Sequence, residues 1–440
     1  MKHTSISRRS RLELILAILL IGLVSACRHT PSATSQGPSD AYIDFALKAC
    51  DVVQAELPEI ERVAEIVAQR HLNGGLIGFP WNSQALQQEL MGRSGGMVCT
   101  GFDRGWKKER TEAEKTNDIA IISWERPPAA SELKQLQDEK ARGCYVIGFG
   151  PKHMPALTEH VKLCDAWFDT GFGENDSVVR FDDGSMGGRG NALMNTLHGW
   201  ALTAEIVSAL TRHGKMPTMW KSYSCEDGRE WGNRYLGKMQ FHDDFQIAPI
   251  AKGKLAKDYL NKIRGYVKTF QTTQHTAVEE TASHIAAEMR KGNKTVVATM
   301  GHLAWTIIGK FEDARWAKAL DLNDGAPGQV KDYNDTTPDG ALVLRLGYSG
   351  QHAPETEIFA RKHQREMLIT ASDNPRPEWK VPTNLVTKIE MGWEFGDACV
   401  SIPGYPIKVF PPSGVIQIVA YECVNVEVLE RLTENTEAKH

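Results

Sequence analysis

The sequence predicts an α/β fold of two tandem α/β/α sandwiches, each with a doubly wound, mostly parallel sheet. Short continuous apolar runs alternate with amphipathic helical stretches, which is typical of strands buried on both faces. The pattern occurs twice, and 440 residues suffice for two domains with a core each. A net charge of -4 without a long Lys/Arg block argues against nucleic-acid binding.

Six apolar runs are predicted as strands, and each half should open and close with a long helix. The opening helices are expected near 41–72 and 258–292, and the closing helices over 191–214 and 413–432. The predicted strands are Leu76–Phe79, Ile119–Ser123, Cys144–Gly148, Val296–Thr299, Leu342–Leu346 and Met367–Thr370.

Two pairs of segments suggest an internal duplication. Residues 64–78 resemble 284–298, and residues 117–150 resemble 339–372, in the same order and at an offset near 220. The predicted domains are therefore 41–235 and 254–435.

The N-terminus reads as an export signal. Basic residues precede a short apolar stretch that ends in Leu-Val-Ser-Ala-Cys, which resembles a bacterial lipobox with Cys27 as the lipidated residue. We expect a signal peptide over 1–26, a flexible tether over 27–40 and a lipid-anchored protein on the periplasmic side of the cell envelope. An uncleaved anchor and a plain secretory signal are the alternatives.

The sequence predicts neither a metal site nor a cofactor. The seven cysteines after Cys27 show no zinc-ligand spacing and read mostly as small buried hydrophobes. The Gly- and Asp-rich stretch 171–191 lacks the phosphate-loop and EF-hand signatures and reads as an irregular loop. The three polar residues of the run His242–Phe245 are considered as metal ligands only as a minor alternative.

The second half resembles the SIS (sugar isomerase) family of phosphosugar-binding domains. The resemblance rests on "TMGHLA" after the first strand, on "GYSGQHAP" after Leu346, and on the "FGDACV…FPPSG" segment that leads into the last helix. It covers about 255–432 well and 41–225, a degenerate first half, more faintly. It implies a flavodoxin-like strand order, and a homodimer or an internal pseudo-dimer.

The resemblance also implies site residues. Helix N-termini and hydroxyls at the carboxyl ends of the strands would hold a sugar phosphate, and a Glu with a His would shuttle protons between C1 and C2. On this sequence the catalytic candidates are Glu355 and His302. The ligand-binding candidates are Gly301, His302, Ser349, Gly350, Thr356, Ser413, Asn82, Ser83 and Ser123.

Several positions depart from the family pattern. Leu303 and Gly347 stand where the family has hydroxyl residues, and Glu125 in the first half would repel a phosphate. Each candidate also has a plain structural interpretation, as a turn, a helix cap or a surface residue. Fewer hydroxyl donors weaken the case for phosphate, so an unphosphorylated amino sugar or cell-wall fragment is also considered.

Three functions follow. The favoured one is an exported, lipid-anchored protein that binds a carbohydrate derivative, either a sugar phosphate or an amino sugar, with aldose–ketose isomerase activity left open. The alternative is a non-catalytic envelope protein that retains the fold for packing or partner contacts. The third is a cytoplasmic-type isomerase whose N-terminus only imitates a signal.

Overall fold

The computed structural model describes residues 37–80, 84–100, 110–223, 225–299, 315–321, 340–347, 365–370 and 385–437. Within these residues no helix is both long enough and apolar enough to cross a bilayer. Cys27 and the predicted signal and tether lie outside them, so export and lipidation stay predictions.

The first sheet lies in the first half of the chain and is wholly parallel. Its order is β1-β2-β3-β4, and Thr100 forms an isolated parallel bridge to Ile77 on the free side of β1. If the segment at Thr100 is counted as the second strand in chain order, the strands lie across the sheet in the order 2-1-3-4-5. This is the predicted flavodoxin-like order. The strands are β1 (Ile77–Gly78), β2 (Ile119–Ser123), β3 (Tyr145–Gly150) and β4 (Ala166–Asp169).

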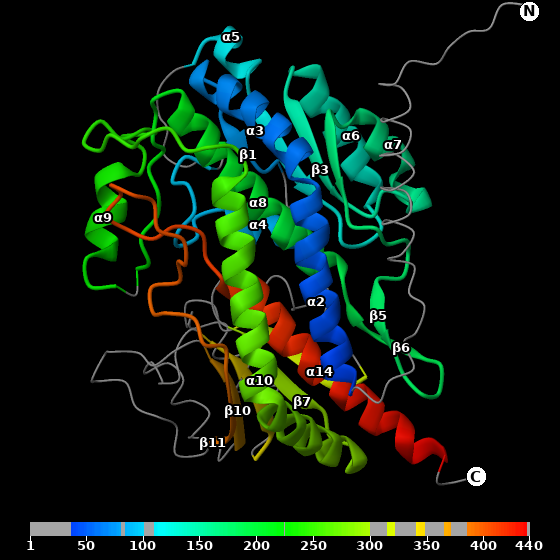
Figure 1. Ribbon diagram of the computed structural model, residues 1–440. Coiled ribbons are helices and arrows are strands. Elements are labelled where there is room, and N and C mark those ends of the chain that lie inside the picture. Colours follow the sequence, from blue (N-terminus) through cyan, green and yellow to red (C-terminus); the bar gives the residue numbers. More distant parts are fainter. Residues whose placement is uncertain are drawn as a thin grey trace, which may run out of the picture. The chain divides into compact units, whose positions relative to one another are not determined.

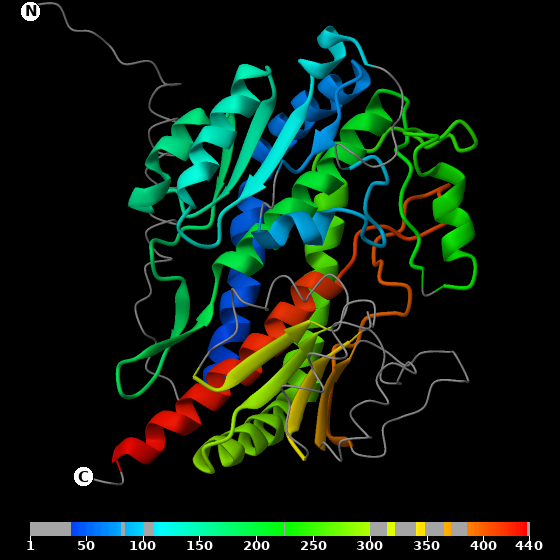
Figure 2. The same cartoon turned by 180° about the vertical axis from the view of Figure 1, so that it is seen from behind.

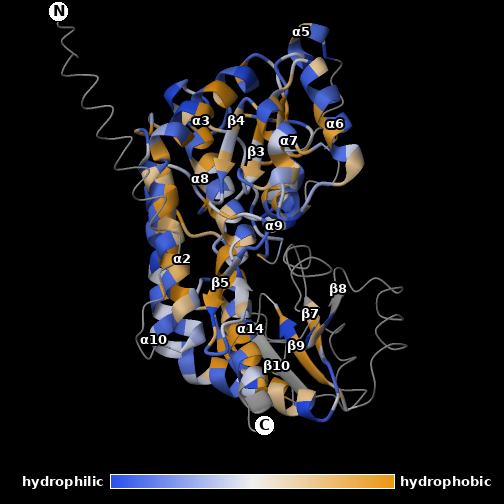
Figure 3. Cartoon of the chain, turned by 90° about the vertical axis from the view of Figure 1, so that its right-hand side faces the viewer, coloured by the Kyte–Doolittle hydropathy of each residue, from blue (hydrophilic) through white to orange (hydrophobic). Residues whose placement is uncertain are grey.

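Helices cover both faces of the first sheet because its strands are apolar on both sides. Ile119 and Ile121 of β2 join the main core, whereas Ala120 and Ile122 join a smaller core with Leu136. Figure 3 shows the hydrophobic residues of β3 and β4 between the surrounding helices. The helices of this half are α2 (Pro38–Ala55), α3 (Leu57–Leu72), α4 (Gln84–Leu90), α5 (Glu112–Lys115), α6 (Ala130–Ala141), a 3₁₀ turn (Pro155–Leu157), α7 (Thr158–Leu163) and α8 (Asn191–Arg212).

The second sheet has five parallel strands in the order β11-β10-β9-β7-β8, which is 2-1-3-4-5 read from the other edge. Leu342, Leu344 and Leu346 of β9 belong to the main core. Figure 2 shows α14 lying along this sheet. The strands are β7 (Thr295–Thr299), β8 (Ala317–Asp321), β9 (Leu342–Leu346), β10 (Arg365–Thr370) and β11 (Leu385–Glu390).

Long helices from both halves pack against one another. The 37-residue α10 (Lys254–Arg290) runs beside α2, and α14 (Ser413–Glu437) crosses next to them (Figure 1). Arg264 pairs with Asp51 at 2.8 Å between Nη2 and Oδ1, and Gln271 donates to Asp40 at 3.1 Å. The short α9 (Gly228–Tyr235) lies between α8 and α10 in the chain. The predicted α/β fold class is confirmed, whereas the domain boundaries and the duplication stay predictions.

Two sequence-based assignments differ from the structure. The expected helix 41–72 is divided at Glu56, because Pro58 in the first turn of α3 has no N–H for a continuous helix. The stretch 171–191 is not wholly irregular, since it contains an antiparallel hairpin of β5 (Ser177–Arg180) and β6 (Met186–Arg189). Val178, Val179 and Phe181 are buried, and their burial outweighs the weak strand propensity of the glycines around them.

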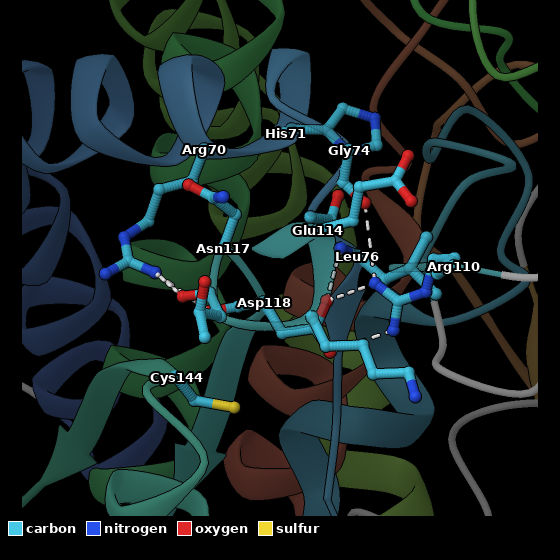
Figure 4. A network of polar contacts seen from close by, with 12 residues as sticks. Arg70, His71, Gly74, Leu76, Arg110, Glu114, Asn117, Asp118 and Cys144 are labelled. Carbon is cyan, nitrogen blue, oxygen red and sulfur yellow. Dashed lines mark hydrogen bonds and ion pairs between the residues drawn. The ribbon is translucent and has the colours of Figure 1, made fainter. Parts of the chain in front are cut away.

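A polar network closes the amino-terminal edge of the first sheet (Figure 4). Asp118, just before β2, accepts from the backbone N–H of Leu76 at 2.8 Å and pairs with Arg110 at 2.5 Å. Arg70 donates to the backbone oxygen of Thr116 at 2.8 Å. These groups satisfy one another at the strand edge where ligands rarely bind in parallel sheets, so we assign them a structural role.

Candidate functional site

Each sheet has a topological switch point at its carboxyl edge. In the first sheet, the chain continues from β1 to the segment at Thr100 on one side and from β2 to β3 on the other side. In the second sheet, it continues from β7 to β8 on one side and from β9 to β10 on the other. Ligands of open parallel α/β sheets bind in the crevice at such points. Ser123 ends β2, and Gly347 directly follows β9.

At the second switch point, Gln417 of α14 contacts the strand end. Its Nε2 donates to the backbone oxygen of Gly347 at 3.0 Å, across 70 residues of sequence. The side chain is 0% exposed, and its Oε1 has no hydrogen-bond partner among the residues that the structure describes. An enclosed amide oxygen without a donor costs about 1–3 kcal/mol, so its presence requires an explanation.

At the first switch point, Asn195 of α8 makes the corresponding contact. Its Nδ2 donates to Oε1 of Glu125 at 2.9 Å, and these two residues are also 70 positions apart. Asn195 is 1% exposed, and within the described part of the chain its Oδ1 has no hydrogen-bond partner. Gln417 and Gly347 each lie 222 positions after Asn195 and Glu125, although the acceptor is a backbone oxygen in one contact and a side-chain carboxylate in the other.

The helices that close the two halves, α8 and α14, each begin beside a buried carboxylate. Oδ1 of Asp397 accepts from the backbone N–H of Ser413 at 3.3 Å, and Oδ2 of Asp176 accepts from that of Asn191 at 3.3 Å. A negative charge there complements the helix dipole. Burial raises the pKa of both carboxyls, and Arg93 beside Asp397 opposes that rise in part, as Arg189 does beside Asp176.

A buried ionic cluster joins the start of α14 to the segment after α4. Arg93 lies 3.0 Å from Glu89 and 3.7 Å from Asp397, and it also donates to the Ser413 hydroxyl. Glu89 accepts from the indole of Trp200 at 2.8 Å, and burial raises the pKa of its carboxyl. The Ser413 hydroxyl donates to Oδ2 of Asp397 at 2.8 Å. The cluster holds the first turn of α14 in place.

The structure places two of the predicted site residues. Ser413 is buried at the start of α14 within the ionic cluster, and Ser123 is buried at the end of β2. Their roles in ligand binding stay predictions. The remaining candidates lie outside the described residues: Asn82, Ser83, Gly301, His302, Ser349, Gly350, Glu355 and Thr356.

The His242–Phe245 run forms a hydrogen-bonded chain. Nδ1 of His242 donates to Asp244 at 2.6 Å, and its Nε2 accepts from the hydroxyl of Tyr405 at 2.9 Å. The rings of Tyr235 and Phe245 lie 4.7 and 4.9 Å from the imidazole. Burial lowers the pKa of His242. No group of three or more metal-ligating side chains occurs among the residues described.

Sequence reasoning missed Asn195, Gln417 and the ionic cluster. The predicted duplication offered a signal for the two amides, because aligning 117–150 with 339–372 also aligns residue 195 with residue 417. Glu89 and Arg93 are four residues apart, which is the spacing of a helical ion pair, but Asp397 lies far from both in the sequence and nothing there links it to them.

No family model matches the chain, and no curated protein matches it. Similar solved structures include a candidate phosphosugar isomerase from Silicibacter pomeroyi DSS-3, with 11% identity, 90% of this chain and 98% of that chain covered, and a TM-score of 0.45. The C-terminal domain of glucosamine-fructose-6-phosphate aminotransferase from Francisella tularensis shares 10% identity over 91% of this chain and 98% of that chain, with a TM-score of 0.45.

A candidate sugar-binding protein from Salmonella typhimurium LT2 shares 9% identity over 89% of this chain and 99% of that chain, with a TM-score of 0.47. Similarity at this level does not assign the chemistry of this chain, which must be argued from its own residues.

Proposed function

We propose that the chain binds a small carbohydrate derivative at the carboxyl edge of the second sheet, beside Gly347 and Gln417. The observation that carries the proposal is the enclosed Oε1 of Gln417, which receives no hydrogen bond from any described residue although it lies at the switch point of a parallel sheet. A sugar hydroxyl is a suitable donor for such an oxygen.

The proposed site combines this amide with the predicted loop residues after β7 and β9. His302, Ser349 and Gly350 would contact the sugar, and Glu355 is the candidate base if the sugar is isomerised. The proposal includes export and lipidation at Cys27, which the N-terminal sequence supports. Whether the ligand carries a phosphate is left to the experiment.

The alternative is a non-catalytic envelope protein that keeps the fold for packing. The observation in its favour is that Asp176 and Asp397 cap the starts of α8 and α14, so neither helix start offers a free anion site. The two functions differ in whether the chain recognises any sugar.

A thermal-shift screen separates them. Hexoses, amino sugars and their phosphates are added at millimolar concentration, and a bound sugar raises the melting temperature by mass action. We expect Gln417→Met to lose at least tenfold in affinity, because Met keeps the volume but offers only a weak hydrogen-bond acceptor in place of the amide oxygen.

Gln271→Ala is the matched control. That amide also lies in the second half, but it contacts Asp40 and not the strand ends. No shift with any sugar supports the structural alternative. A shift that survives Gln417→Met places the ligand elsewhere.

A further inference from the structure

We infer that the second switch point takes a sugar in its unphosphorylated form and rejects the phosphate ester because of its charge. The inference rests on the proposed function, since the site is the same, and it adds the class of ligand that the site accepts. It is carried by the occupied start of α14, by the charge of the ionic cluster beside it, and by the unmet acceptor of Gln417.

The occupied start of α14 is the first step. A phosphate at the start of a helix binds through backbone N–H groups and nearby hydroxyls. Here the backbone N–H and the hydroxyl of Ser413 both donate to the carboxylate of Asp397, at 3.3 and 2.8 Å. Asp397 is buried. A phosphate at this helix start would therefore have to lie beside a carboxylate of the chain or displace it.

The charge of the ionic cluster is the second step. Its guanidinium, that of Arg93, lies 3.0 Å from Glu89 and 3.7 Å from Asp397. A buried guanidinium requires at least one ionised carboxylate as its partner. The cluster is neutral with one carboxylate ionised and carries one negative charge with both ionised. In neither state does it offer a positive charge to a phosphate.

The closeness of this cluster to Gln417 is the third step. Gln417 lies four residues after Ser413 in α14, which is about one turn and about 6 Å along the helix axis. Glu89 reaches the same turn, since a Cβ at Gly414 would overlap its carboxylate. Solvent screens charges little at such buried positions, so the cluster acts on a charged group of the ligand.

Arg345 of β9 does not change this balance. It alternates with Leu344 and Leu346, whose side chains lie in the main core together with Ile416 of α14. Arg345 therefore faces the side of the second sheet that is turned away from α14.

The unmet acceptor is the fourth step. Oε1 of Gln417 receives no hydrogen bond from any residue that the structure describes. A sugar hydroxyl can donate to it, whereas a phosphate dianion has only acceptors. A phosphate directed at this oxygen would meet a further acceptor and a cluster without positive charge.

The test is calorimetric titration of the full chain with glucose, glucosamine and the 1- and 6-phosphates of both sugars. The titrations are done at pH 8, well above the second pKa of a phosphate ester, which is about 6. Only binding that Gln417→Met weakens at least tenfold is assigned to the second switch point. We expect each phosphate ester to bind there at least tenfold more weakly than its parent sugar.

A neutral probe separates charge from size. 6-O-Methylglucose carries an added group without a charge, so it should bind like glucose. If it is rejected as strongly as glucose 6-phosphate, the discrimination is steric and the inference is overturned.

Asp397→Asn removes one negative charge and keeps an acceptor for the N–H of Ser413. We expect it to narrow the difference in affinity between glucose and glucose 6-phosphate. Asp176→Asn is the matched control, since Asp176 is a buried carboxylate at the start of α8. The control should leave the difference unchanged. Glucose binding shows that each variant is folded, and Glu89→Gln tests the same charge if Asp397→Asn does not fold.

The inference is also overturned if a phosphate ester binds as tightly as its parent sugar, or if Asp397→Asn discriminates as the wild type does. Sugar binding at Gln417 persists in both cases, so the proposed function stands. If no probe binds, or if no binding depends on Gln417, the proposed function fails and the inference fails with it.

Discussion

Asp397 accepts two hydrogen bonds from Ser413, one from its backbone N–H at 3.3 Å and one from its hydroxyl at 2.8 Å. Ser413 is the first residue of α14, so this carboxylate fixes where the helix begins. Gln417, one turn later on the same face, is thereby directed at Gly347. The geometry of the proposed site thus depends on residues that need not touch the ligand.

The close approach of Glu89 to α14 predicts that Gly414 tolerates no side chain. A Cβ at this position would lie 1.9 Å from Oε1 of Glu89, and that carboxylate is held by Arg93 and Trp200. We expect Gly414→Ala to lower the free energy of unfolding by about 1–3 kcal/mol. Urea denaturation measures the change.

Gly265→Ala is the control, because it lies within α10 and its added Cβ meets nothing within 4 Å. We expect that substitution to raise stability by about 0.5–1 kcal/mol. Equal effects of the two substitutions would show that Glu89 does not pack against α14 as described.

Removal of Arg93 should leave two buried carboxyls without their shared cation. We expect Arg93→Met to cost about 3–5 kcal/mol in unfolding free energy, against less than about 1 kcal/mol for Arg62→Met at an exposed ion pair. The loss should be larger at pH 8 than at pH 5, because without Arg93 both carboxyls fold best in their protonated form. A cost that does not change with pH would argue against this cluster.

Glu422 predicts a distinct pH dependence of stability. Burial raises the pKa of this carboxyl from 4.5 to about 8, and its hydrogen bond from Asn425 opposes that rise. The folded chain therefore holds a proton that the unfolded chain has released, and stability falls as the pH rises from about 4.5 to 8.

We expect Glu422→Gln to remove a slope of at most about 1.4 kcal/mol per pH unit in that window. Chemical denaturation of both proteins at a series of pH values gives the difference in their unfolding free energies. The contributions of the other titrating groups are common to both proteins and cancel in that difference. Parallel curves for the two proteins would contradict the prediction.

The hydroxyl of Tyr405 donates a hydrogen bond to Nε2 of His242, and Nδ1 of the same ring donates one to Asp244. We expect Tyr405→Phe to cost about 1–3 kcal/mol, because it leaves a buried ring nitrogen without a partner. Tyr223→Phe, at a side chain that is 46% exposed, should change stability by less than about 0.5 kcal/mol. Thermal unfolding of both variants tests the difference.

The sequence was sufficient for the strands that are buried on both faces. Ile119–Ser123 and Leu342–Leu346 were predicted with the bounds that the structure shows, because continuous apolar runs have few other solutions. It was insufficient for the hairpin of β5 and β6, because the many Gly and Asp residues of this stretch obscure the pattern of its three buried apolar side chains. Strand pairing there depends on packing against distant helices.

The candidate site was less predictable than the fold. The sequence singled out Ser413 as a candidate, but it offered no sign that Ser413 contacts Asp397 and Arg93. Arg93 and Ser413 are 320 residues apart, so only the folded chain reveals that contact.

A crystal structure of the chain soaked with the sugar that gives the largest thermal shift would show where the sugar binds. We expect a sugar hydroxyl within hydrogen-bond distance of Oε1 of Gln417, beside Gly347. A sugar bound at any other place, with a water molecule on that oxygen, would contradict it.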